Sequence, residues 1–195
     1  MKPTAVRLLD HEAAEDIFFG QVVMIWARWF LIAAGTIFFL WTAQKSTQVA
    51  LGILPIVGLM VLNFYLHGRY LLERPSNIVQ ITAASTIDVA LVSAIVLVWQ
   101  SNTTPGLTGL ASPFFVLYYP VVLAVAFVMP RRLTLIFTAS TAAAYAAICL
   151  PDLTSITAVK VLVLRLATLA AMGGIGTFYW RIQRSRRHEG LGATG

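Results

Sequence analysis

The feature that most constrains this chain is a series of apolar segments, each long enough to cross a lipid bilayer as a helix. The clearest runs from Ser112 to Arg132, where residues 113–130 carry no charge and the segment stops at Pro130-Arg131-Arg132. A helix of about 20 apolar residues spans the hydrocarbon core, and paired arginines are typical of its cytoplasmic end. The sequence therefore predicts a polytopic membrane protein.

Five further segments bring the number of predicted transmembrane helices to six, so the predicted fold class is all-α. The predicted spans are residues 22–43, 48–66, 78–99, 112–132, 132–150 and 158–180. Composition agrees, because 58% of the residues are hydrophobic and 11% are charged, against about 25% charged residues in soluble domains.

The remaining residues form two predicted flanking segments. Residues 1–21 are an N-terminal interfacial segment, in which residues 4–16 are expected to form a short helix on the membrane surface, with a disordered tail as the alternative. Residues 22–180 are the six-helix bundle, and residues 181–195 are a basic cytoplasmic tail.

The positions of the basic residues predict the orientation, because positive charge collects in cytoplasmic loops. One side of the predicted bundle carries Lys2, Arg7, Arg28, Arg69, Arg74, Arg131, Arg132, Arg181, Arg184, Arg186 and Arg187. The other side carries Lys45 and Lys160, with Arg165 nearby inside the sixth span. Both termini are therefore predicted to be cytoplasmic.

Several function classes find no support in the sequence. The net charge of +6 comes from basic residues at helix ends, so membrane lipid is an expected contact and nucleic acid is not. None of the three histidines, His11, His67 and His188, lies deep in a predicted span, as a b-type haem would require. Within the predicted spans, no two carboxylates and no Ser/His or Cys/His pair lie close in sequence at one depth. We expect neither an enzyme, nor a metal site, nor a covalently bound cofactor.

Asp88 is the polar residue whose position most needs an explanation, because it lies near the middle of the third predicted span. A carboxylate at that depth is costly and usually faces the bundle interior or a functional site. Arg165 is the candidate counter-charge, although it is expected somewhat nearer the outer surface. The alternative is that Arg165 extends to that surface and Asp88 bonds a hydroxyl such as that of Tyr118, Tyr119 or Thr141. Arg28 is expected to extend to the cytoplasmic face.

Small residues in the last two spans predict close helix packing, within the bundle or against a partner subunit. They are Ala139, Ala143 and Ala147 in the fifth span and Ala170, Gly173, Gly174 and Gly176 in the sixth.

The order of these features resembles the six-helix membrane sensory domain of bacterial histidine kinases. The similar positions are Arg28-Trp29, Asp88, the run from Gly109 to Tyr118, Arg131-Arg132, and Tyr179-Trp180-Arg181-Ile182-Gln183-Arg184. The resemblance covers roughly residues 22–187 and implies a location in the inner, cytoplasmic membrane of a bacterium.

Within that group, redox-responsive kinases carry a GGxxNPF loop associated with quinone. The corresponding residues here are 108–114, of which Gly109, Pro113 and Phe114 match while Thr108 and Ser112 differ. The resemblance implies a quinone or lipid contact formed by Gly109, Ser112, Pro113, Phe114 and Tyr118.

A kinase would continue past Arg187 into dimerisation and ATP-binding domains, which this sequence does not include. The leading expectation is therefore a non-catalytic accessory subunit of a multisubunit, quinone-linked electron-transfer complex, such as the quinol-oxidising alternative complex III. Its partners would be other integral-membrane subunits. The first alternative is the membrane sensory module of a signalling system, and the second is a small transporter or substrate-binding component in which Asp88 and Arg165 line a polar cavity.

Overall fold

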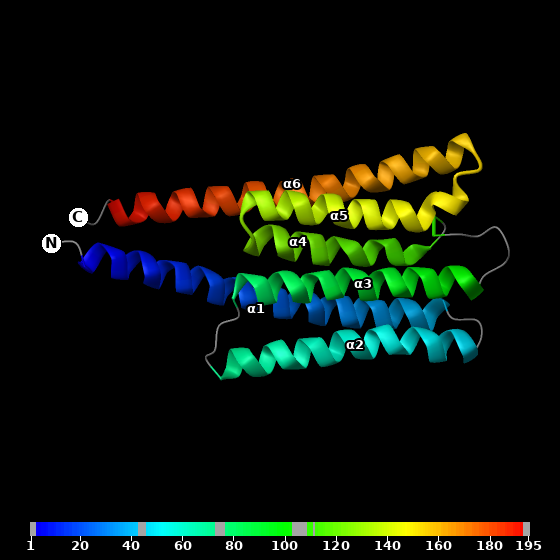
Figure 1. Ribbon diagram of the computed structural model, residues 1–195, viewed down its shortest axis with the longest axis horizontal. Coiled ribbons are helices and arrows are strands. Elements are labelled where there is room, and N and C mark those ends of the chain that lie inside the picture. The colour runs from blue at the N-terminus through cyan, green and yellow to red at the C-terminus, as the bar shows by residue number, and fades with distance from the viewer. Residues whose placement is uncertain (1–2, 43–45, 73–76, 103–108, 111, 193–195) are drawn as a thin grey trace.

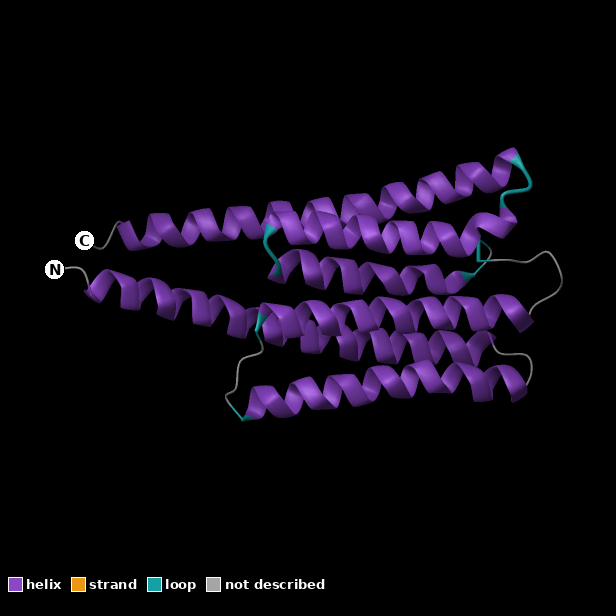
Figure 2. Cartoon of the chain, viewed as in Figure 1, coloured by secondary structure: helices purple, strands orange, loops and turns teal. Residues whose placement is uncertain are grey.

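The computed structural model describes residues 3–42, 46–72, 77–102, 109–110 and 112–192. Within these ranges the chain forms helices joined by turns and loops, without strands, as Figure 2 shows. The predicted all-α class is confirmed.

The part of the chain that the structure describes forms six α-helices and two short 3-10 helices, and Figure 1 shows how they are arranged. In chain order they are α1 (Pro3–Thr42), α2 (Ser46–Leu71), α3 (Ile78–Asn102), η1 (Pro113–Leu117), α4 (Tyr118–Val128), α5 (Arg131–Cys149), η2 (Leu150–Asp152) and α6 (Ile156–Gly192).

Among the described residues, five helices are long and apolar enough to cross a membrane, which indicates a multi-pass membrane protein. The five segments are Gly20–Trp41, Gly52–Leu71, Ile78–Leu97, Arg131–Asp152 and Ile156–Tyr179. The remaining predicted span corresponds to η1 followed by α4, and its apolar part, Pro113–Val128, is shorter.

The helix expected within the N-terminal segment differs from the prediction, whereas the C-terminal segment continues the last helix. Residues 4–16 do not form a separate surface helix, because α1 continues without a break from Pro3 to Thr42. At the other end, α6 continues past the apolar segment to Gly192. Figure 1 shows that both extensions project from the same end of the bundle.

Helix α4 lies at the centre of the bundle. It packs against α1 on one side and α6 on the other, and also contacts α3 and α5. Its residues Val121, Val122, Val125 and Ala126 are almost completely buried. The shortest of the α-helices is therefore the one around which the others are arranged.

Prolines and a capping serine define the limits of the η1–α4 segment. Ser112 caps η1, because its Oγ accepts a hydrogen bond from the backbone N–H of Phe114 at 3.3 Å. Pro113 follows in the first turn, where its missing N–H costs nothing. At the other end Met129 is extended, with φ −98° and ψ 152°, as expected for a residue before a proline. Pro130 then leads directly into α5.

Two glycines allow α6 to approach its neighbours closely. A Cβ on Gly173 would lie 2.6 Å from Oγ1 of Thr138 in α5, and one on Gly176 would clash with Ala126 in α4. Gly174, Ala170 and the α5 alanines Ala139, Ala143 and Ala147 are exposed. Only Gly173 and Gly176 of the predicted small residues therefore pack tightly within the chain.

We expect Gly176→Leu to destabilise the protein by about 1–3 kcal/mol, the usual cost of overpacking. Gly174→Leu is the matched control, because a Cβ there meets nothing within 4 Å and leucine favours a helix over glycine. Thermal unfolding of both variants in detergent checks this expectation. Equal losses of stability at the two positions would contradict the packing described here.

Candidate functional site

The most deeply buried charges in the described part of the chain form an ion pair between α1 and α3. Nε of Arg28 donates hydrogen bonds to both carboxylate oxygens of Asp88, at 2.9 Å to Oδ1 and 2.7 Å to Oδ2. Nη2 of Arg28 lies 2.7 Å from Oδ2 as a further ion-pair contact. Side-chain exposure is 3% for Arg28 and 2% for Asp88. The two charges therefore compensate one another away from solvent and lipid.

The expectation that Arg28 extends to the membrane surface is wrong. Arg28 lies eight residues after Gly20 and Asp88 ten residues after Ile78, the starts of the apolar parts of α1 and α3. At the helical rise these positions are about 12 and 15 Å along their helices. The signal for the pair was therefore present in the sequence as two opposite charges at similar depth.

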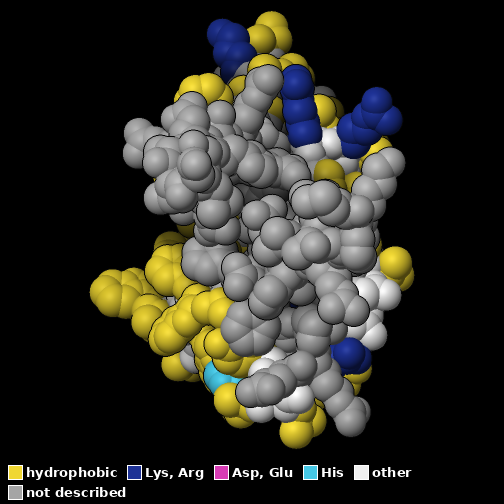
Figure 3. Space-filling model, turned by 90° about the vertical axis from the view of Figure 1, so that its left-hand side faces the viewer, with side chains coloured by type: hydrophobic (Ala, Val, Ile, Leu, Met, Phe, Trp, Pro, Cys, Tyr) yellow, Lys and Arg dark blue, Asp and Glu magenta, His cyan; other side chains and the backbone are white. Residues whose placement is uncertain are grey.

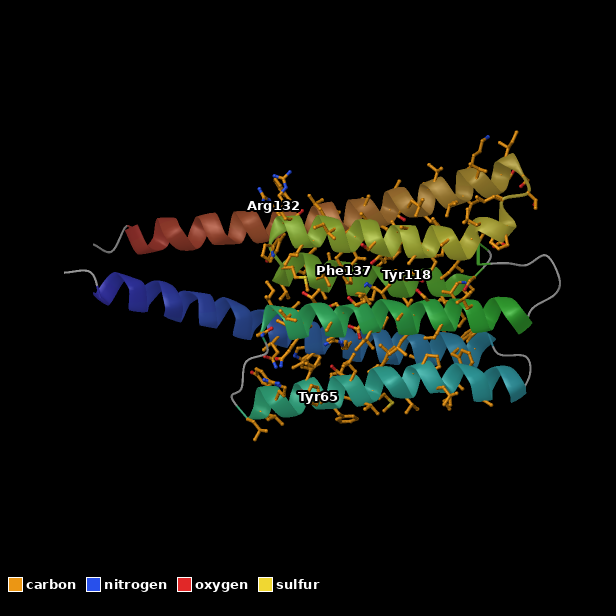
Figure 4. All side chains as sticks on the ribbon, in the orientation of Figure 1. Tyr65, Tyr118, Arg132 and Phe137 are labelled. Carbon is orange, nitrogen blue, oxygen red and sulfur yellow. The ribbon has the colours of Figure 1, made fainter. Side chains whose placement is uncertain are left out.

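The other predicted partners of Asp88 are engaged elsewhere. The hydroxyl of Tyr118, labelled in Figure 4, lies 2.7 Å from Oγ of Ser93. The hydroxyl of Tyr119 lies 2.8 Å from Oγ1 of Thr168. Thr141 donates to the backbone carbonyl of Phe137 within its own helix. These contacts connect helices or turns but do not reach Asp88.

Arg165 is also not the partner of Asp88. Its Nη1 donates to the hydroxyl of Tyr145 at 2.6 Å and to the carbonyls of Gly109 and Ser112, both at 3.4 Å. Its guanidinium carbon lies 4.9 Å from the ring centroid of Phe115, a cation–π distance. Arg165 therefore ties α6 to α5 and to the turn before η1.

The same turn receives two further polar contacts. The hydroxyl of Tyr145 donates to the carbonyl of Gly109 at 3.3 Å, and the backbone N–H of Leu110 donates to Oδ2 of Asp152 at 3.4 Å. Asp152 is 7% exposed. No local pattern in the sequence points to Tyr145 or Asp152, because only the fold brings them to residues 109 and 110.

Most of the residues proposed to contact quinone lie in the protein interior. Ser112, Phe114 and Tyr118 are at most 1% exposed, and the carbonyl of Gly109 accepts two hydrogen bonds. Pro113 differs, because it lines a large open groove. Only Pro113 of the five therefore lies where a membrane ligand has direct access.

This groove has a volume of about 850 Å³ and is lined by α1, η1, α4 and Met172 of α6. Its lining residues are uncharged and almost wholly apolar. Trp26 and Phe30 of α1 lie along it with 70% and 65% of their surface exposed. The one phenol in the lining, Tyr119, is already bonded to Thr168.

The ion pair lies directly behind the floor of the groove. A cavity of about 10 Å³ is lined by Arg28 and Asp88 on one side and by Pro120 and Ala124 of α4 on the other. Pro120 and Ala124 also line the groove. A single layer of α4 and α1 side chains thus separates the buried charges from the groove.

Asn63 on α2 is a further buried polar residue. It has no exposed surface, and in the described part of the chain neither its amide nitrogen nor its oxygen has a hydrogen-bond partner. Leaving an amide unpaired inside a protein costs about 1–3 kcal/mol. We find no structural explanation for this asparagine.

Comparisons with protein-family models, with curated proteins and with solved structures find no match for this chain. Among the described residues, no three His, Cys, Asp or Glu side chains lie close enough together to hold a metal ion.

Neutralising either member of the ion pair leaves the other charge buried without compensation. We therefore expect Asp88→Asn and Arg28→Gln each to destabilise the protein by about 3–5 kcal/mol. The double variant should lose much less than the sum of the two, which thermal unfolding of all three variants in detergent measures.

Arg165→Gln combined with Asp88→Asn is the control, because Arg165 contacts Gly109, Ser112 and Tyr145 instead. The losses in free energy of unfolding caused by Arg165→Gln and by Asp88→Asn should therefore add in the double variant. Additive losses for Arg28 and Asp88, or strong coupling between Asp88 and Arg165, would contradict the observed pairing.

Proposed function

We propose that this protein is a non-catalytic accessory subunit of a multisubunit membrane complex. The observation that carries the proposal is the groove between α1, α4 and α6. Its volume is about 850 Å³, and its lining residues are uncharged. Such a surface suits packing against another membrane component, and a subunit that binds through it stabilises the assembly without carrying out chemistry itself.

The proposal includes a topology of six spans with both termini cytoplasmic. Support for an even number of crossings comes from the start of α1 and the end of α6, which lie at the same end of the bundle (Figure 1). Figure 3 views that end, where dark blue Lys and Arg side chains lie around the rim. The exposed Arg131 and Arg132 belong there, as the preference of basic residues for the cytoplasmic side requires. The η1–α4 segment then forms the fourth and shortest of the six spans.

The proposed link to quinone rests on the resemblance of residues 108–114 to the quinone-associated loop, and Pro113 at the groove is the residue that supports it. The partner complex would be a quinol-oxidising assembly of the bacterial inner membrane, such as alternative complex III. The quinone would contact the groove end near Pro113.

One observation favours a second candidate function, a membrane sensory module. Helix α6 runs without a break from Ile156 to Gly192, beyond its apolar segment. A continuous helix leaving the bundle is a suitable element for passing a conformational change to a signalling partner.

Purification from native membranes in mild detergent distinguishes the two candidates. We expect the protein to elute in fixed ratio with larger subunits that carry haem or iron–sulfur clusters, as identified by mass spectrometry and absorbance. Elution as a lone dimer, or with a kinase-bearing partner, would contradict the accessory-subunit proposal and favour signalling.

The quinone link predicts that Pro113→Ala lowers quinone occupancy of the purified complex. The substitution removes about two methylene groups from the groove, worth roughly 1.6 kcal/mol, or about tenfold in affinity. Quinone extracted from the complex and quantified by chromatography measures the effect. Pro151→Ala is the control, because Pro151 is exposed in η2 and does not line the groove. Unchanged occupancy in Pro113→Ala would remove quinone from the proposal.

A further inference from the structure

Two small cavities adjoin the ion pair between Arg28 and Asp88. The inner cavity is the one that the pair shares with α4, and its volume is about 10 Å³. The outer cavity also measures about 10 Å³ and lies between α1, α2 and α3, where Gln21 and Arg28 are its polar lining residues. Gln21 follows Gly20, the start of the apolar part of α1, so the outer cavity is the one nearer the end of the bundle.

Each cavity has the size and the lining that a buried water molecule requires. A space of about 10–15 Å³ holds one water molecule where polar groups line it, whereas purely apolar cavities stay dry. The inner cavity offers the guanidinium of Arg28 and the carboxylate of Asp88, and the outer cavity offers Arg28 and the side chain of Gln21. Met24 and Arg28 line both cavities, so the two water positions are neighbours.

Arg28 has hydrogen-bonding capacity that the described part of the chain leaves unused. Its Nη2 lies 2.7 Å from Oδ2 of Asp88, but among the described residues this nitrogen has no partner at hydrogen-bond geometry. The hydrogen bonds to the carboxylate come from Nε instead. Buried polar groups are almost always hydrogen-bonded to protein or to ordered water. A water molecule in a cavity that Arg28 lines supplies the acceptor.

Further buried polar residues of α1, α2 and α3 lie at the same levels. The buried polar residues of these three helices, all at most 3% exposed, are Gln21, Arg28, Asn63, Ser85 and Asp88. Asn63 lies eight residues before Leu71, the end of the apolar part of α2, or about 12 Å deep, like Arg28. It is also one helical turn from Leu66, which lines the outer cavity. Its amide, which the described part of the chain leaves unpaired, therefore adds a hydrogen-bonding group for water beside that cavity.

Neither a metal cation nor an anion fits these cavities as well as water does. The positive charge of Arg28 lines both cavities and repels a cation. Asp88 already compensates that charge, so no net positive charge remains to attract an anion. Water is neutral and both donates and accepts hydrogen bonds, so it serves the guanidinium and the carboxylate alike.

We propose that both cavities bind water and that this water exchanges with the solution along the polar side chains between α1, α2 and α3. The path begins at Gln21, passes Arg28 and ends at Asp88. Exchanging water gives protons a route to a carboxylate inside the membrane, and intramembrane carboxylates often belong to such routes. The inference goes beyond the accessory function and does not depend on it, because it concerns the interior of the bundle and not a partner.

X-ray radiolytic labelling of the protein purified in detergent tests for this water. A short X-ray pulse splits water into hydroxyl radicals, which oxidise the side chains beside them before they diffuse away, and methionine sulfur is a very reactive target. Met24 reports on the cavities, because it lines both of them and is only 3% exposed. Mass spectrometry of the digested protein measures its oxidation.

Met129 is the matched control within the same sample. It is 1% exposed and lines neither cavity. Its neighbour Val128 lies against Gly20, so Met129 is about one helical turn nearer the end of the bundle than Met24. Radicals that enter from the solution would therefore reach Met129 first.

The expected result is that the pulse oxidises Met24 and leaves Met129 unmodified. Absence of oxidation at Met24, or oxidation of Met129 to the same extent, would overturn the proposal.

The double variant Arg28→Leu with Asp88→Leu tests whether the ion pair holds the water. Apolar replacement of a buried ion pair is often tolerated, and the apolar cavities that result should be dry. Oxidation of Met24 should then be lost. Retained oxidation in a variant that still unfolds cooperatively would overturn the proposal. If the variant does not fold, the comparison of Met24 with Met129 in the unaltered protein decides the question.

Rapid mixing with water enriched in a heavy oxygen isotope, just before the pulse and without dissolved oxygen, tests the exchange. The oxygen added to Met24 then comes from water, so Met24 should take up the heavy isotope. Oxidation of Met24 with the ordinary isotope alone would show that the water is trapped, and would overturn the proposed path.

Discussion

The buried ion pair between Arg28 and Asp88 is the constraint on which the register of the central helices depends. Inside a membrane, apolar helix surfaces gain little by leaving lipid, so polar contacts and close packing decide how helices associate. An uncompensated charge at depth is costly, and α1 and α3 must therefore keep residues 28 and 88 at one level. Because Pro120 and Ala124 adjoin the pair, the position of α4 follows from the same constraint.

A second polar centre fixes the start of the η1–α4 segment. Arg165 of α6 and Tyr145 of α5 both bond the carbonyl of Gly109, and Asp152 bonds the next N–H along the chain. The segment is thus held at its beginning by α5 and α6, and along its length chiefly by α1 and α6. Its short helix stays in place because neighbours from both halves of the chain hold it.

The helices were predictable because each apolar segment has a length set by the bilayer, and the depth of Asp88 in its segment made its burial predictable too. Its partner was not identified, because Arg28 was expected near a helix end, whereas α1 extends well beyond the apolar segment. The contacts of Arg165 join residues 20 to 56 positions apart, and no local pattern encodes them. The loop resemblance pointed to Ser112 and Phe114 as ligand contacts. Both residues are instead buried at the start of η1, where Oγ of Ser112 accepts a hydrogen bond from the backbone N–H of Phe114.

The two polar centres also fix the shape of the groove. An apolar surface in a membrane carries no penalty for facing lipid, so its fitness to bind a partner depends on how rigidly it is held. The floor of the groove belongs to a helix that is anchored at its start and packed along its length, so its side chains are held in one arrangement. A preorganised surface loses less conformational entropy on binding than an adaptable one. The charges buried behind Ala27 and Pro120 therefore act on the groove indirectly, by fixing the two helices that supply most of its lining.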